Sequence, residues 1–96
     1  MAGKLRPALI VSASRFNGGD DFVAVPISSQ PKADDPYSFP IRDSDAYFAD
    51  TGLKYNSAVK WTKPQAISKT VVARRLGQVP ELVLNQILSL VRSVFS

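Results

Sequence analysis

The chain has 96 residues, the size of one small domain, so we treat 1–96 as a single unit. It contains no cysteine and no histidine, which excludes disulfides, thiolate catalysis, cysteine-ligated zinc and a Ser–His–Asp triad within the chain. A net charge of +4 favours an anionic partner such as nucleic acid, with a functionally neutral basic surface as the alternative. No apolar stretch approaches the roughly 20 residues of a membrane span, so we expect a cytoplasmic protein without membrane contact.

The first third of the chain predicts a β-hairpin. The apolar run ALIVSA, 8–13, favours a strand that is buried on both faces. The stretch FNGGDD marks a turn, and FVAVPIS, 22–28, predicts the second strand. Because Pro26 has no amide donor, we expect it at an edge, a bulge or a strand end, with Ser28 near the rim of the sheet.

The middle of the chain predicts short elements joined by loops. The proline-rich stretch 29–38 favours an exposed loop, and SFPIR, 38–42, is a short strand at most. Residues 43–57 mix acidic and aromatic residues, which is typical of one helical turn within a loop. The alternating SAVKW, 57–61, predicts a half-buried strand, and 65–77 begins like a strand and ends at a glycine.

The segment VPELVLNQILSLVRSVFS at the C-terminus is the clearest helix. Pro80 suits the first helical position, and Glu81 and Arg92 match the helix dipole at its two ends. Apolar residues recur at helical spacing and form a broad stripe, which consists of Val83, Leu84, Ile87, Leu88, Leu90, Val91, Val94 and Phe95. We therefore expect a small mainly β barrel completed by one helix, whose apolar face packs on the barrel and on a second subunit.

Several motifs in this order resemble the MazF/PemK toxins of type II toxin–antitoxin modules. They are RPALIVS, VAVPISSQ, TGL, SAVKW, AISK and RRLGQV, followed by the amphipathic helix. The resemblance runs from about Gly3 to the end of the chain. It implies an SH3-like twisted β-barrel with a C-terminal α-helix, usually as a homodimer with a cognate antitoxin that has an acidic tail. It also implies a growth-inhibiting endoribonuclease that cuts single-stranded mRNA at short sequences without metal or cofactor.

The same resemblance implies two catalytic residues. Arg6 stands at the arginine before the proline, and Ser28 stands where the family usually has threonine. RNA carries its own nucleophile, the 2′-hydroxyl, so a guanidinium that stabilises phosphate charge and a hydroxyl donor can suffice. The alternatives are a solvated cation at a strand entrance for Arg6 and a hydroxyl that caps local backbone for Ser28.

A set of polar, basic and aromatic residues forms a candidate RNA-binding face. These residues are Lys4, Arg15, Ser29, Gln30, Lys32, Lys60, Trp61 and Lys63. Cations contact phosphates, and Trp61 either stacks on a base or covers the barrel. The acidic stretches 33–35 and 43–45 lack the spacing of a calcium loop, so we expect acidic loops there and no metal site.

One departure from the family concerns the start of the sequence. Family members usually carry a strand–loop–strand segment of the GDIVLVDFDP kind before the Arg-Pro strand, with an acidic residue close to the arginine. Here the sequence starts MAGKLRP. Three explanations are open: a misassigned start, a natural short form or a truncation. We therefore expect an unpaired apolar edge along 8–13 and a weak or inactive nuclease.

The alternative function is a non-catalytic binding module on the same fold. One form is a degenerate toxin that only binds its antitoxin, and another is a CcdB-like gyrase inhibitor. The ending VRSVFS lacks the tryptophan–glycine–isoleucine tail usual in the CcdB toxins. A small basic RNA-binding barrel without a toxin role is the third option.

Overall fold

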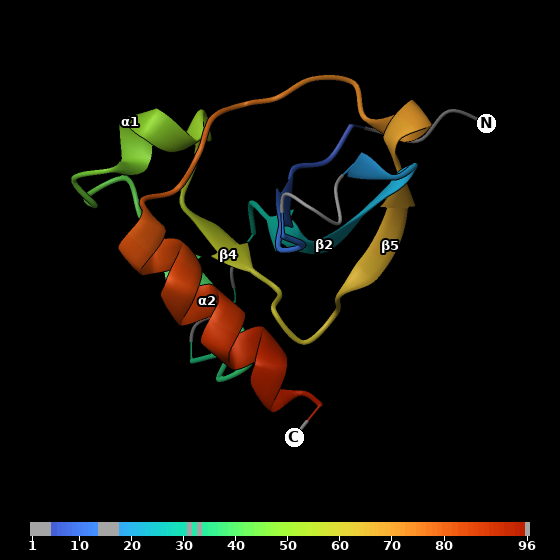
Figure 1. The fold of residues 1–96 in the computed structure, drawn as a ribbon. Coiled ribbons are helices and arrows are strands. Elements are labelled where there is room, and N and C mark those ends of the chain that lie inside the picture. The colour runs from blue at the N-terminus through green and yellow to red at the C-terminus, as the bar shows by residue number, and fades with distance from the viewer. Residues whose placement is uncertain (1–4, 14–17, 31, 33, 96) are drawn as a thin grey trace.

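The computed structural model describes residues 5–13, 18–30, 32 and 34–95, and the mainly β fold with a C-terminal helix is confirmed (Figure 1). The elements in chain order are β1 (Ala8–Ile10), β2 (Asp21–Ser28), β3 (Phe39–Ile41), α1 (Phe48–Thr51), β4 (Ser57–Val59), β5 (Gln65–Ser68), the 3-10 turn η2 (Lys69–Val71) and α2 (Glu81–Ser93). No helix in these described ranges is long and apolar enough to cross a lipid bilayer.

Strand β2 organises the sheet because three other strands pair with it, all antiparallel. Strand β1 lies along one edge, with Leu9 opposite Val25. The first half of β2 pairs with β5, and its last two residues pair with β4, which in turn pairs with β3. The described strands form an open path, β1-β2-β4-β3 with β5 beside β2, so the barrel expected from the sequence is a strongly bent sheet that does not close.

The position of Pro26 corrects the sequence-based expectation of an edge, a bulge or a strand end. It lies inside the central strand, opposite Ala8 of β1. Its carbonyl accepts a hydrogen bond from the Lys60 amide at 2.8 Å, whereas the Ile27 amide on the opposite edge donates to Pro7 at 3.1 Å. The donor missing from Pro26 therefore falls on the edge where the partner of β2 changes from β5 to β4, and the ladder loses little by it.

The core lies between the sheet and α2. Val25, Ile41 and Val59 from three strands meet the helix residues Val83, Ile87 and Val91 in one buried cluster. These three helix positions recur at the spacing of one helix face, as the sequence predicts.

The ends of the helix differ from the expectation by a residue or two. Pro80 is the N-cap and Glu81 the first helical residue, so the proline stands one position earlier than expected. Val94 and Phe95 follow the last helical residue and are exposed, Phe95 at 76%. They extend the apolar stripe in sequence without joining the core, because the helix ends before they can turn inward.

An extended segment, residues 72–80, connects η2 to α2 and arches over the open side of the sheet (Figure 1). The expected strand character of 65–77 ends at Ser68. Two glycines fix the crossing of this segment with α1, since a Cβ on Gly52 would strike the Leu76 carbonyl and one on Gly77 would strike the Asp50 carbonyl. Gly52 also has a φ of 72°, which favours glycine.

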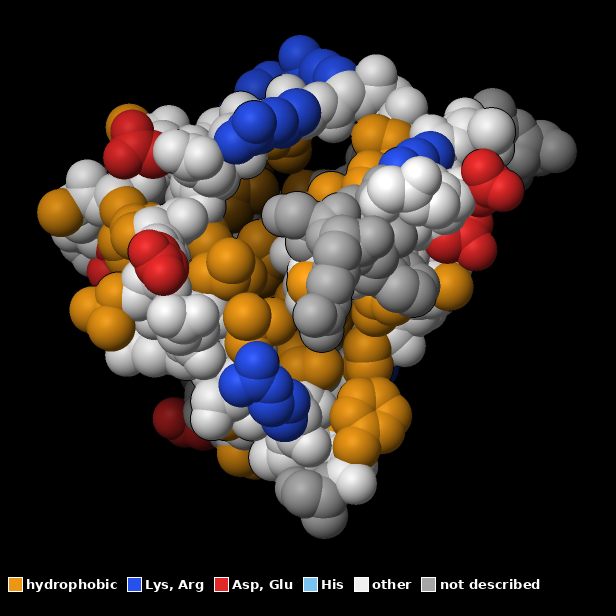
Figure 2. All heavy atoms as spheres, in the orientation of Figure 1, with side chains coloured by type: hydrophobic (Ala, Val, Ile, Leu, Met, Phe, Trp, Pro, Cys, Tyr) orange, Lys and Arg blue, Asp and Glu red, His pale blue; other side chains and the backbone are white. Residues whose placement is uncertain are grey.

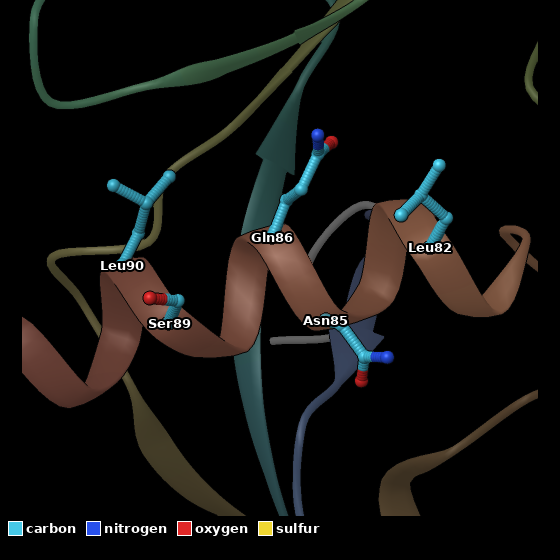
Figure 3. A pocket seen from close by; sticks show the side chains of 5 residues that line it. All are labelled: Leu82, Asn85, Gln86, Ser89 and Leu90. Carbon is cyan, nitrogen blue, oxygen red and sulfur yellow. The ribbon is translucent and has the colours of Figure 1, made fainter.

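The outer side of α2 is a shallow hollow rather than part of the core (Figure 3). Its lining comes from the helix alone and consists of Leu82, Asn85, Gln86, Ser89 and Leu90. None of these side chains is charged, so this surface offers little to an anionic substrate.

A pair of truncations on α2 tests the assignment of its two sides. We expect Ile87→Ala to lower the free energy of unfolding by about 2–5 kcal/mol, because Ile87 is fully buried and its removal leaves a cavity. Urea denaturation followed by circular dichroism measures this difference. Leu82→Ala is the matched control, since Leu82 is 72% exposed, and a loss as large as that of Ile87→Ala would contradict the packing described here.

Candidate functional site

The β1–β2 register, extended beyond the start of β1, brings Arg6 and Ser28 to the same level. Ala8 pairs with Pro26, and the Pro7 carbonyl accepts from the Ile27 amide. Continued by one residue, this register sets Arg6 opposite Ser28. This would be a non-hydrogen-bonded pair of an antiparallel ladder. In such pairs the Cα atoms lie about 4.5 Å apart and the side chains are closest. Residues 22 apart in the sequence thus become cross-strand neighbours.

Ser28 lies on the face of the sheet opposite to α2, and the extended register puts Arg6 at the neighbouring position. Val25, Ile27 and Val59 contact the core, so the alternating positions face the other way. The row across the sheet that contains Ser28 continues through Ala58 of β4 to Pro40 of β3. Arg6 is exposed and makes no hydrogen bond or ion pair with any described residue. Its guanidinium is available to an anionic ligand on this face.

Ser28 combines a local structural role with a free donor. Its Oγ accepts a hydrogen bond from the Gln30 amide at 3.1 Å, the local cap that was the alternative interpretation of this hydroxyl. Accepting that bond leaves the hydroxyl hydrogen available to a ligand. Ser29 and Gln30 directly after the strand are exposed, at the rim where the sequence places them.

Asp35 holds the loop after β2 against the sheet. Its Oδ1 accepts from the Tyr37 amide at 2.9 Å, and its Oδ2 accepts from Ser38 Oγ at 2.7 Å and Lys60 Nζ at 3.0 Å. Hydrogen bonds from Ser38, Tyr37 and Lys60 lower the pKa of Asp35 from 3.8 to about 2. The Tyr37 ring packs beside Trp61 at 6.2 Å between centroids, which ties the same loop to the turn after β4.

The predicted RNA-binding residues fall into three groups: some have structural partners, some are exposed, and some lie outside the described residues. Lys60 is paired with Asp35, and the Trp61 ring contacts Tyr37 and the core, so both have structural partners. Lys32 and Lys63 are exposed, in the loop after β2 and the turn after β4. Lys4 and Arg15 lie outside the described residues.

The basic residues of the 72–80 segment form a separate group. Figure 2 shows Lys and Arg side chains gathered over this segment at the top of the view, where the sequence has Arg74 and Arg75. Arg75 donates to the Gly77 carbonyl and to Gln78 Oε1, so its guanidinium is partly engaged by its own segment.

A polar hollow beside Ser28 is the feature that sequence reasoning missed. Its volume is about 440 Å³, and it is lined by Lys32, Asp34, Asp35, Ser38, Pro40, Arg42, Asn56, Ser57 and Ala58. The polar residues that line the hollow are visible in the sequence, but they belong to separate segments. The acidic loop 33–35 and the strand ends near 42 and 56 are distant in the chain. Within the described ranges, no three acidic residues cluster in a way that would hold a metal ion.

Comparison with known proteins supports the family suggested by the motifs. A family model described as "PemK-like, MazF-like toxin of type II toxin-antitoxin system" matches residues 1–95. The chain belongs to this toxin family. A comparison with curated protein sequences found no match.

Solved structures of MazF toxins share the fold of this PemK-like chain. The Mycobacterium tuberculosis toxin MazF-mt6 matches with a TM-score of 0.73 at 20% identity, over 94% of this chain and 85% of its own. The MazE–MazF complex of Deinococcus radiodurans gives 0.75 at 22% identity, over 94% and 84%. A mycobacterial endoribonuclease solved with its cognate antitoxin gives 0.73 at 23% identity, over 94% and 80%. At these identities the likeness establishes the fold.

The Asp35 network predicts a pH-dependent contribution to stability. Because the pKa of Asp35 is lowered in the folded protein to about 2, its contribution is complete above pH 3.8 and is lost as the pH falls toward 2. We expect the free energy of unfolding to fall less between pH 4 and pH 2 for Asp35→Asn than for the wild type, as measured by urea titration. Asp50→Asn, at an exposed position of α1, is the control, and equal slopes for Asp35→Asn and the wild type would contradict the network's role.

Proposed function

We propose that this PemK-like toxin is an endoribonuclease that cuts single-stranded RNA without a metal ion. The observation that supports the proposal is the β1–β2 register, which, extended past Pro7 and Ile27, brings Arg6 level with Ser28. A guanidinium and a hydroxyl at neighbouring positions supply donors that match the non-bridging oxygens of a phosphodiester. The endoribonuclease named among the similar structures supports the same chemistry.

The reaction needs no nucleophile from the protein. The 2′-hydroxyl oxygen next to the scissile phosphate attacks phosphorus, and the bond from phosphorus to the 5′-oxygen breaks. The 2′-hydroxyl loses its proton to water and the 5′-oxygen gains one from water, which leaves a 2′,3′-cyclic phosphate and a 5′-hydroxyl. Arg6 stabilises the charge that builds on the phosphate oxygens, and Ser28 donates a hydrogen bond to one of them.

The remaining contacts with RNA come from the loops around this face. Lys32 and Lys63 are exposed cations in the loop after β2 and the turn after β4, and they suit phosphates on either side of the cut. Ser29 and Gln30 offer neutral hydrogen-bonding groups at the rim. Binding through phosphates weakens as salt concentration rises, because bound RNA releases counterions.

Substitution of Arg6 tests the proposal directly. We expect Arg6→Ala to lower the cleavage rate at least 100-fold, since one charged donor to a transition state is worth about that much. Cleavage of a long single-stranded RNA in EDTA, with ends mapped by primer extension, measures the rate. Arg6→Lys should restore part of the activity, because it returns charge without the guanidinium's geometry.

Arg92→Ala is the matched control for charge. Arg92 lies in the last turn of α2, on the other side of the sheet, so its removal should leave cleavage unchanged. A folded Arg6→Ala protein with full activity would refute the catalytic assignment. An intact wild-type chain that binds RNA and never cuts it would favour the non-catalytic alternative.

We further propose that the toxin acts as a homodimer controlled by an antitoxin with an acidic tail. Apolar side chains remain exposed on and around β1 and the 72–80 segment, namely Leu5, Ile10, Val71, Val72 and Leu76. Solved relatives form complexes with their antitoxins. Analytical ultracentrifugation of the full chain should give a dimer at micromolar concentration, with Leu5→Ser and Val71→Ser together shifting it to monomer. A wild-type monomer at these concentrations would overturn the dimer.

A further inference from the structure

We propose that the hollow beside Ser28 is a specificity pocket that receives a guanine base flanking the scissile phosphate, with Asp34 as the residue that selects it. This inference rests on the proposed ribonuclease function and names the base that the site prefers. It is carried by three observations: the position of the hollow on the sheet, the complementary groups along its walls and the state of its two carboxylates.

The position of the hollow follows from the same register that places the catalytic pair. Ala58 pairs with Ser28 on one side and Pro40 on the other, and both Ala58 and Pro40 line the hollow. Neighbouring strands lie about 4.8 Å apart, so this floor begins one strand away from the Ser28 hydroxyl. Ala58 is 2% exposed and Pro40 is exposed, so a nucleotide whose phosphate contacts Arg6 and Ser28 can lay its base against Pro40.

The two carboxylates of the hollow differ in their hydrogen-bond partners among the described residues. Asp35 accepts three hydrogen bonds that hold the loop, from Tyr37, Ser38 and Lys60. Asp34 is exposed and makes no hydrogen bond or ion pair with any described residue. Its φ of 60° turns the loop at this point. The Asp35 network therefore fixes the loop, and the Asp34 carboxylate is left available to a ligand.

The opposite wall carries donors. Arg42 directly follows β3 and Asn56 directly precedes β4, at the Ile41–Ser57 end of their pairing, and both line the hollow. Asn56 Oδ1 accepts from the Asp43 amide, which leaves the two N–H donors of its side chain free to face a ligand. The hollow thus has the Asp34 carboxylate beside Lys32 on the loop side, donors from Arg42 and Asn56 at the strand ends, and Pro40 and Ala58 in its lining as well.

Guanine is the base whose edges match this arrangement. It presents two neighbouring donors, N1–H and the N2 amino group, which suit the two oxygens of one carboxylate. It presents two acceptors, O6 and N7, which suit arginine and amide donors. Uracil has a single donor between two carbonyls, and adenine has no donor at its N1. The volume of about 440 Å³ falls within the range of small-ligand sites.

The test measures binding separately from cleavage. The probes are fluorescent uridine hexamers that carry a 2′-O-methyl group at every position and so cannot be cut, with one guanosine, inosine or adenosine moved through the positions. We expect one guanosine position to bind the full-length protein roughly 10-fold tighter than uridine by fluorescence anisotropy. Inosine, which lacks the N2 amino group, should lose most of this preference.

The variant is Asp34→Asn, which keeps the shape of the side chain and tolerates a positive φ. We expect it to remain folded and to bind guanosine and uridine hexamers alike. Asp21→Asn is the matched control, because it removes the same charge from an exposed position at the other end of β2 and should keep the preference.

The possible results separate this inference from the proposed function. Equal binding of all hexamers by the wild type, or a guanosine preference that survives in Asp34→Asn, overturns the pocket. In parallel, unmodified RNA cut without guanine beside the cut site overturns the pocket and leaves the nuclease standing. Guanosine-selective binding by a wild type that never cuts unmodified RNA overturns the nuclease and supports the pocket.

Discussion

The antiparallel register of β2 is the constraint on which the rest of the structure depends. Eight residues of one strand set the positions of β1, β5 and β4, and through β4 that of β3. Because side chains alternate along a strand, a slip of one residue would exchange the core face for the exposed face in every partner at once. On one edge, β2 pairs first with β5 and then with β4. Pro26 lies where the partner changes, so the ladder needs no amide donor from it.

Because of this register, the core residues and the candidate site lie on opposite faces of the sheet. Val25 and Val59 face α2, while Ser28 and Ala58 lie at alternating positions and face away from it. The helix contributes Val83, Ile87 and Val91 to the buried cluster, on the face of the sheet away from Ser28. Substitutions on the helix side therefore act through folding, and substitutions on the opposite face act on ligands, which makes the two kinds of effect separable by experiment.

The loop after β2 is held against the sheet by Asp35 and also lines the hollow beside Ser28. Its backbone would be free to move if Asp35 did not draw Tyr37, Ser38 and Lys60 together. The ion pair uses one cation that the sequence suggested for RNA, and the loop that it holds lines the hollow beside Ser28. A polar network of this kind supplies geometry at the site even where its net contribution to stability is small.

The sequence alone determined the family, the order of the main elements, the terminal helix with its buried stripe and the candidate pair Arg6 and Ser28. These features are local, because they depend on motifs and on hydrophobic periodicity, which can be read within a short window. The tertiary structure decided what depends on pairing between distant segments. It placed Pro26 in a central strand, engaged Lys60 with Asp35 and joined three loops into a hollow, because a strand register brings together residues that no local pattern connects.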